Sequence, residues 1–422
     1  MAALAERMRR PVHWRVPYDA ARRRCLSTAA GSGPGEHPVI DLATVLNAAS
    51  REPATGDSAP SGEHAATLAA MRAALTEHGY FYASGVAPVL PEALINSTYA
   101  FADRLHDLPL ATKQLYARPE GSGETVNGIY SGADVGATEP AYEVGTLSLV
   151  RSWEYSRTRR PDGATDSSGF PQAETVGWGD HGDGTFLSML DHLYAQQDAL
   201  ARALMLAFAE MFALPRRTFL QHFDGGDLGT IRLLRYPGPA PAGDGSAAPP
   251  SASAALDDKT LAGISAHTDF EAFTLMHQDA PGLQFLRPLP GGGAVASAPV
   301  AAHAAAQTSG REWVDAPVRK GEFVVIVGDM LERFTNGALS ATPHRVLPTP
   351  WQRNSIVRFN AFHPGTVVAP LPQFVASGGG ETHYTPVTME THMATTLGNL
   401  EQGLGSWSEE SQRSISAHRR YP

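Results

Sequence analysis

The chain has 422 residues, of which 42% are hydrophobic and 18% charged, and 33 Lys and Arg against 43 Asp and Glu give a net charge of −10. This length and composition predict a folded protein with a large core and exclude a disordered one. The acidic balance argues against a general attraction to nucleic acid or anionic membranes, and the single cysteine, Cys25, excludes an internal disulfide framework.

Residues 1–26 differ in composition from the rest of the chain. They hold seven arginines, no lysine and two acidic residues, so their local charge is 7 − 2 = +5. Arg-rich, acid-poor N-termini are typical of organelle transit peptides, and Arg22–Ala30 resembles a mitochondrial processing site. We therefore expect a mitochondrial transit peptide over 1–26. A plain basic tail, and a cytoplasmic or plastid location, are the alternatives.

The next part of the chain predicts a mainly helical region with short strands. Apolar residues recur at helical spacing between Leu68 and Leu75, between Leu94 and Leu105, and from about Phe186 to Phe212. These three segments are predicted to be helices. Short strands are predicted at His37–Asp41 and at the aromatic run Tyr80–Ala83.

From Thr230 onward the pattern changes to short strands separated by Gly/Pro turns. We expect strands at 230–236, 261–267, 272–277, 283–286, 312–314, 322–327 and 355–362. Such a series favours an antiparallel barrel or jelly roll. Two segments, 237–258 and 288–310, have linker composition and are predicted to be surface insertions. The expected fold class is α+β, a jelly-roll core with a mainly helical N-terminal region packed on it.

His267 and Asp269 stand two residues apart in a strand-like run. Side chains at this spacing point to the same face of a strand, so an imidazole and a carboxylate can share one metal ion. The spacing alone is a weak signal, because it recurs elsewhere in the chain, for instance at two further pairs. We expect structural roles for both of those pairs, His181 with Asp183 and His277 with Asp279.

Arg353 and Ser355 are also two residues apart on a predicted strand, a short distance after His344. A forked guanidinium beside a hydroxyl suits the capture of a carboxylate. Two histidines with one carboxylate form the facial triad of non-haem Fe(II) oxygenases, which leaves coordination positions open. An Arg/Ser pair near such a triad is what a 2-oxo acid co-substrate requires.

An ordered series of short segments resembles the isopenicillin N synthase-like branch of the 2-oxoglutarate/Fe(II)-dependent dioxygenases. The segments are Pro38–Leu42, Ala74–Tyr82, Leu108–Leu110, Leu233–Pro237, His267–Thr274, Pro281–Gln284, Trp313, Gly328–Asp329, His344–Val346 and Arg353–Ser355. The resemblance implies a double-stranded β-helix, which agrees with the jelly roll predicted from the strand pattern. It also implies an enzyme that uses Fe(II), 2-oxoglutarate and O₂ and releases succinate and CO₂.

Carried over by motif, the resemblance assigns the catalytic iron to His267, Asp269 and His344. It assigns the distal carboxylate of 2-oxoglutarate to Arg353 and Ser355, with Tyr236 as a further hydrogen-bond partner. The family often has Asn two residues before this tyrosine, where the present chain has Leu234. Asn127, Tyr130, Arg151 and Glu154 are candidate substrate contacts.

The sequence thus predicts four regions: the transit peptide (1–26), an N-terminal dioxygenase region (37–225), a jelly-roll domain (228–370) and a C-terminal extension (371–422). The leading hypothesis is a monomeric dioxygenase that hydroxylates, desaturates or cyclises a small-molecule substrate and binds neither nucleic acid nor a membrane. One alternative is an oxidase of the same fold without 2-oxoglutarate. The other is a non-catalytic metal-binding or ligand-sensing jelly roll.

Overall fold

The structure is a computed structural model, and its described residues are 37–50, 62–117, 130–135, 141–143, 145–156, 158–159, 165–166, 185–223, 229–238, 260–288 and 311–404. The predicted transit peptide, nearly all of the two predicted insertions, the pair His181/Asp183 and Asn127 lie outside these residues. Within the described part, no helix has both the length and the apolar character needed to cross a membrane.

Eight strands form the major sheet, in the order β1-β2-β14-β11-β16-β8-β5-β3. Their bounds are β1 Val39–Asp41, β2 Tyr80–Ser84, β14 Phe323–Val327, β11 Phe273–Gln278, β16 Arg353–Asn360, β8 Thr230–Tyr236, β5 Arg151–Ser156 and β3 Tyr130–Ser131. Four strands form the minor sheet: β10 (Ile264–His267), β15 (His344–Val346), β12 (Leu283–Pro288) and β13 (Arg311–Asp315). Three further sheets have two strands each: β4 (Thr146–Ser148) with β9 (Thr260–Ala262), β6 (Thr158–Arg159) with β7 (Thr165–Asp166), and β17 (Val367–Val368) with β18 (Val387–Thr388).

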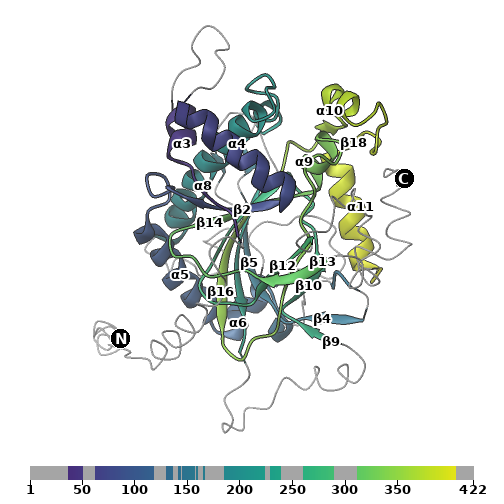
Figure 1. Cartoon of the computed structure of the whole chain (residues 1–422). Coiled ribbons are helices and arrows are strands. Elements are labelled where there is room, and N and C mark those ends of the chain that lie inside the picture. The colour runs from purple at the N-terminus through teal and green to yellow at the C-terminus, as the bar shows by residue number, and fades with distance from the viewer. Residues whose placement is uncertain are drawn as a thin grey trace, which may run out of the picture.

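Helices cover one side of the major sheet, and the C-terminal helix lies on the opposite side of the molecule, beside the minor sheet (Figure 1). The bounds are α3 Ala43–Ala49, α4 Gly62–Glu77, α5 Glu92–His106, α6 Leu110–Leu115, α8 Thr185–Glu210, α9 Asp329–Phe334, α10 Pro372–Ser377 and α11 Met389–Glu401. The predicted helices are confirmed as α4, α5 and α8. Gly79 follows α4 in the left-handed region (φ +75°), a conformation that glycine commonly adopts at the end of a helix.

The apolar strands of the major sheet are buried on both faces. In β14, Phe323, Val325 and Val327 pack in the core beneath the helices, whereas Val324 and Ile326 pack in a second core between the two sheets. A strand with no solvated face needs no polar alternation, which is why this segment is a continuous apolar run. The second core fills the space between the two sheets of the jelly roll and supports the functional site.

The two predicted regions 37–225 and 228–370 share one sheet. β2 of the first region is parallel to β1 and antiparallel to β14 of the second, and β5 pairs with β8. The predicted boundary therefore divides the chain but not the core.

The predicted strand 261–267 is two strands, β9 and β10, which pair with different partners. The break falls at Gly263, where a Cβ atom would lie 2.8 Å from Val346. Only glycine permits this close approach, and the chain changes sheet there. The other predicted strands from Thr230 onward are confirmed within a few residues. β15 carries His344 and was not predicted as a strand, since three residues are too short for a periodic signal.

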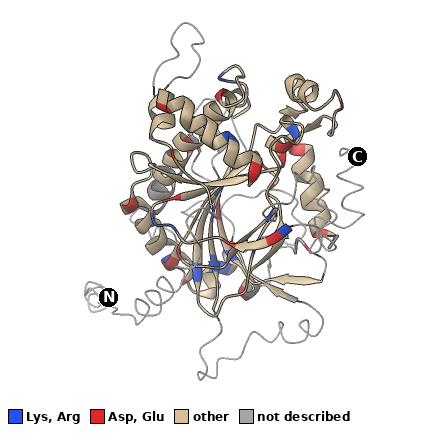
Figure 2. Cartoon of the chain, in the orientation of Figure 1, with Lys and Arg blue, Asp and Glu red and all other residues tan. Residues whose placement is uncertain are grey.

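Acidic and basic residues are interspersed along the described part of the chain in the cartoon of Figure 2. Arg235, for example, donates to Asp103 at 2.7 Å and to Asp107 at 2.6 Å, and links β8 to α5. Such pairs hold the helices on the major sheet.

Candidate metal centre

His267 and His344 lie opposite each other on adjacent strands of the minor sheet. They are register partners in the antiparallel pair β10–β15, and their ring centroids are 4.3 Å apart. Asp269 follows the end of β10, and its Oδ1 lies 3.7 Å from Nε2 of each histidine. All three side chains are buried, and their candidate ligand atoms lie within 4.8 Å of one another. The structure thus brings together three residues that stand up to 77 positions apart in the chain.

Hydrogen bonds orient each of the three side chains. The Nδ1–H of His267 donates to the Ser265 carbonyl at 2.9 Å, and that of His344 donates to the Thr342 carbonyl at 3.0 Å. Because a carbonyl only accepts, these bonds require Nδ1 to carry the proton and leave the Nε2 lone pairs to face Asp269. Such contacts beyond the ligands fix the imidazole tautomer and orientation that a metal site needs.

Burial sets the ionisation of this site in the absence of a cation. It lowers the pKa of His267 well below its ordinary value, and the neighbouring His344 acts in the same direction. A neutral imidazole is the form that binds metals. Burial also raises the pKa of the Asp269 carboxyl, since an unpaired carboxylate is costly in a poorly hydrated site. A divalent cation between the three groups removes that cost. The residues therefore fit Fe(II), with two imidazole nitrogens and one carboxylate oxygen on a single face.

Two contacts at the centre were not identified from the sequence. Thr274 Oγ1 donates to Asp269 Oδ2 at 2.5 Å, which leaves Oδ1 directed at the histidines. Tyr142 stacks on the His267 ring, with centroids 4.2 Å apart and an interplanar angle of 17°. Thr274 lies in the His267–Thr274 motif, so its position was visible but its role was not. Nothing in the spacing of the sequence pointed to Tyr142.

Arg353 is fully buried at the start of β16. Its Nη2 donates to Gln278 Oε1 at 3.0 Å, its Nε donates to the Ala280 carbonyl at 3.3 Å, and its guanidinium lies over the Tyr236 ring, 4.4 Å from the centroid. Among the described residues, nothing forms a hydrogen bond with Arg353 Nη1 or with the buried Ser355 Oγ. A buried guanidinium N–H without a partner is costly. Both atoms are donors, and a carboxylate is an acceptor of the kind that such donors bind.

The second His/Asp pair, His277 and Asp279, is structural, as predicted. Nδ1 of His277 shares a 2.7 Å hydrogen bond with the Tyr99 hydroxyl. Asp279 accepts from the backbone N–H of Asn354 at 2.8 Å and from its side-chain amide at 3.2 Å. Both residues lie in β11 or just after it, away from the triad.

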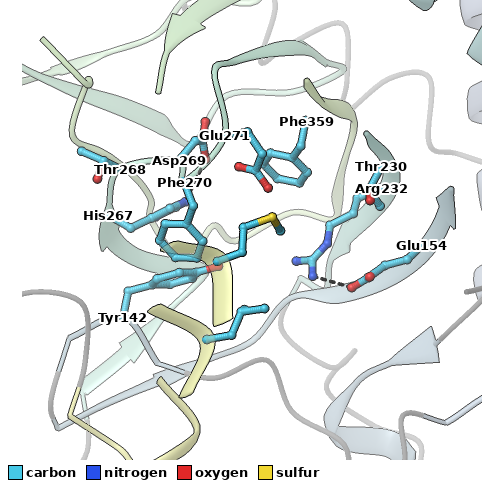
Figure 3. A pocket seen from close by; sticks show the side chains of 12 residues that line it. Tyr142, Glu154, Thr230, Arg232, His267, Thr268, Asp269, Phe270, Glu271 and Phe359 are labelled. Carbon is cyan, nitrogen blue, oxygen red and sulfur yellow. Dashed lines mark ion pairs between the residues drawn. The ribbon is translucent and has the colours of Figure 1, made fainter. Parts of the chain in front are cut away.

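A pocket opens beside the triad (Figure 3). Its lining residues are Tyr142, Glu154, Thr230, Arg232, His267, Thr268, Asp269, Phe270, Glu271, Phe359, Met393 and Leu397. Of the candidate substrate contacts that the structure describes, Glu154 lines this pocket. Tyr130 donates to Asp134 at 2.9 Å, and Arg151 lies 3.7 Å from the same carboxylate, so neither lines it. Burial, together with the neighbouring Asp269, raises the pKa of Glu271 to about 8.

The fold and the site define a class of protein: a jelly roll of the non-haem Fe(II) oxygenase type, with a buried His/Asp/His triad and a buried arginine. Comparison with known proteins gives the same class. Residues 248–361 match the family model described as the 2OG-Fe(II) oxygenase superfamily. The matched segment holds His267, Asp269, His344 and Arg353, so the family model covers the residues of the candidate site.

Relatives and solved structures extend the likeness beyond the matched segment. The chain is 27% identical over 270 residues to the 2-oxoglutarate-Fe(II) type oxidoreductase hxnY of Emericella nidulans, which covers 63% of this chain and 61% of that one. It is 26% identical over 362 residues to leucoanthocyanidin dioxygenase 2 of Oryza sativa subsp. japonica, 83% of this chain and 81% of that one. The crystal structure of the dioxygenase for auxin oxidation of rice superposes with a TM-score of 0.59 at 20% identity, over 91% of this chain and 100% of that one, which confirms the fold.

Proposed function

We propose that this protein is a 2-oxoglutarate- and Fe(II)-dependent dioxygenase that oxidises a small-molecule substrate and releases succinate and CO₂. In this proposal His267, Asp269 and His344 hold the iron, and Arg353 and Ser355 hold the distal carboxylate of 2-oxoglutarate. One observation carries it: two residues of β16 on the same face of the strand, Arg353 and Ser355, are both buried, and neither Nη1 of the first nor Oγ of the second has a hydrogen-bond partner among the described residues.

Each part of the site has a defined task in this reaction. Bound Fe(II) supplies the positions at which the co-substrate and O₂ are activated for oxidation of a substrate C–H bond. Arg353 is held in place by Gln278 and by the Tyr236 ring, so the co-substrate meets a guanidinium of fixed orientation. This favours Arg353 and Ser355 as the anchor that directs the 2-oxo acid end toward the triad. Tyr236 serves as the surface beneath the guanidinium and as a further partner of the carboxylate.

The pocket beside the triad is the proposed substrate site. Met393 and Leu397 of α11 cover it with apolar side chains, and His392 fixes the helix by a 3.0 Å contact between its Nε2 and Asp329 Oδ2. This cover limits the access of water to the reacting centre.

The decisive experiment is an anaerobic titration of the Fe(II)-loaded protein with 2-oxoglutarate. We expect a metal-to-ligand charge-transfer band that saturates at one equivalent, followed by succinate formation when O₂ is admitted. O₂ consumption that is unchanged when 2-oxoglutarate is omitted would identify the oxidase alternative. Metal binding without the band and without turnover would identify the non-catalytic alternative.

We also propose that the chain is imported into mitochondria and acts as a monomer. The Arg-rich composition of residues 1–26 supports import. Incubation with isolated mitochondria should yield a protease-protected product with a new N-terminus near Leu26, and an unprocessed product outside the organelle would contradict it. Light scattering coupled to size exclusion should give the mass of one chain, and a dimer mass would reject the monomer.

A further inference from the structure

We infer that the substrate binds through an uncharged group with a hydrogen-bond acceptor beside a donor, such as an amide, and not through a carboxylate. The group that recognises it is the ion pair of Arg232 and Glu154. This inference rests on the proposed function, because it treats the pocket beside the triad as the substrate site.

Arg232 and Glu154 face each other on adjacent strands. They are register partners in the antiparallel pair β5–β8, and their side chains form an ion pair through Arg232 Nη2 and Glu154 Oε1. The two side chains are only 16% and 13% exposed. Figure 3 shows them on the side of the pocket opposite His267, with the guanidinium directed into it. The pair therefore closes the far end of the cavity that begins at the metal centre.

The charges around the pocket disfavour an anionic substrate. Arg232 is the only Lys or Arg among the described residues that line it, and Glu154 already compensates its charge. The other acidic or basic lining residues are Glu271 and the proposed iron ligands His267 and Asp269, so no second lysine or arginine of the described lining stands beside Arg232 to balance a substrate carboxylate. A substrate carboxylate at Arg232 would meet the Glu154 carboxylate at close range in a partly buried site, where like charges repel strongly. Binding it would require the existing ion pair to separate.

An amide meets no such penalty. Its carbonyl accepts from the Arg232 guanidinium while its N–H donates to the Glu154 carboxylate, so both members of the pair gain a partner and no charge is added. Five further lining residues are apolar or aromatic and suit a flat hydrophobic body: Tyr142, Phe270, Phe359, Met393 and Leu397. The Arg232 guanidinium itself lies 5.8 Å from the centroid of the Phe359 ring. A flat body bound against Phe359 therefore reaches the ion pair with its polar edge.

The test uses two probes of the same shape, benzamide and benzoate. Each is added to the Fe(II)-loaded protein with 2-oxoglutarate under anaerobic conditions, and the iron-induced broadening of its ring protons is measured by NMR against the Zn(II)-loaded protein. Because this broadening falls steeply with distance from the iron, it reports only probe bound beside the triad. We expect benzamide to bind at least tenfold more tightly than benzoate. Equal binding, tighter benzoate binding, or no broadening of benzamide overturns the inference.

Two variants test the residues themselves. Glu154→Gln leaves Arg232 without its compensating charge. The affinity for benzoate should therefore rise at least tenfold relative to the affinity for benzamide. Arg232→Gln should weaken the binding of benzamide, and the binding of benzoate should remain weak. Glu92→Gln is the matched control, since Glu92 is an exposed carboxylate outside the pocket, and it should leave the preference unchanged. An unchanged preference in Glu154→Gln would remove the pair from the recognition site. The comparison of benzamide with benzoate is made on the wild-type protein, so it still tests the inference if either variant fails to fold.

The two proposals fail in different ways. The charge-transfer band with 2-oxoglutarate forms without either probe. If the band were normal but benzoate bound more tightly than benzamide, the dioxygenase proposal would stand and the inferred substrate class would be rejected. If the band were missing but benzamide bound more tightly than benzoate, the dioxygenase proposal would be rejected and the inferred substrate class would stand.

Discussion

Thr274 and Asp269 join the two sheets of the jelly roll at the metal centre. The hydroxyl of Thr274, in β11 of the major sheet, donates a 2.5 Å hydrogen bond to Oδ2 of Asp269, which follows β10 of the minor sheet. This bond occupies one carboxylate oxygen and directs the other at His267 and His344.

Thr274→Val should therefore weaken Fe(II) binding without removing a ligand. Loss of a partner that orients a ligand typically costs about 10- to 100-fold in metal affinity. Valine keeps the shape of threonine, so the fold should be retained. The measurement is an anaerobic titration with Fe(II) or Co(II). Thr274→Ser keeps the hydroxyl and should restore most of the affinity, and equal affinities in the wild type and the valine variant would show that the bond does not act on the metal.

His267→Ala and His344→Ala should each abolish stoichiometric iron loading, because each removes one of only three protein ligands. His277→Ala is the matched control, since His277 is a buried histidine in β11 of the major sheet and contacts Tyr99. It should reduce stability and leave the iron content near one per chain. Iron content is measured after reconstitution and desalting. A loss of iron in His277→Ala together with retention in His344→Ala would reject the proposed ligand set.

Arg353→Leu should raise the apparent KM for 2-oxoglutarate roughly 100-fold, because it removes a charge-assisted hydrogen bond of about 3 kcal/mol in a buried site. Ser355→Ala should have a smaller effect in the same direction, since it removes a neutral hydroxyl. Iron content should be unchanged in both variants, which separates them from the ligand variants. Succinate formation against 2-oxoglutarate concentration is the measurement, and wild-type kinetics in Arg353→Leu would remove this residue from the co-substrate site.

A stability prediction concerns Arg358, which is fully buried in β16 and donates to Asp198 of α8 at 3.1 Å. Asp198→Ala leaves this guanidinium without its carboxylate and should lower the free energy of unfolding by about 2 kcal/mol. Glu92→Ala breaks the exposed pair with Lys320, and exposed pairs contribute little. The midpoint of urea denaturation should fall in the first variant and stay in the second. Equal midpoints for both variants would show that the buried pair of Arg358 and Asp198 does not contribute to the free energy of unfolding.

Much of the site could be predicted from the local sequence. Strand alternation predicted that His267 and Asp269 share a face; the two do meet, although β10 ends at His267 and Asp269 follows it. The same rule holds within β16 for Arg353 and Ser355. The strand pattern from Thr230 onward predicted the jelly roll without reference to any relative. The choice of His344 as third ligand came from the resemblance and not from spacing, because β15 is too short to show a period.

The N-terminal region was predicted less completely. Tyr80–Ala83 was predicted as a strand, but nothing local indicated that it adds to the sheet of a region more than 200 residues later. No local pattern indicated that Gly263 divides one apparent strand into two, since the close approach of Val346 depends on a distant segment.

By itself the sequence determined which chemical groups are present and which neighbours share a face, because backbone geometry sets side-chain direction over two or three residues. Only the tertiary structure decided which of those faces meet. The β10–β15 register aligns His267 with His344, the contact between sheets sets Thr274 against Asp269, and the β5–β8 register pairs Arg232 with Glu154. Each of these pairings depends on hydrogen bonds and core packing between distant segments, which no local pattern encodes.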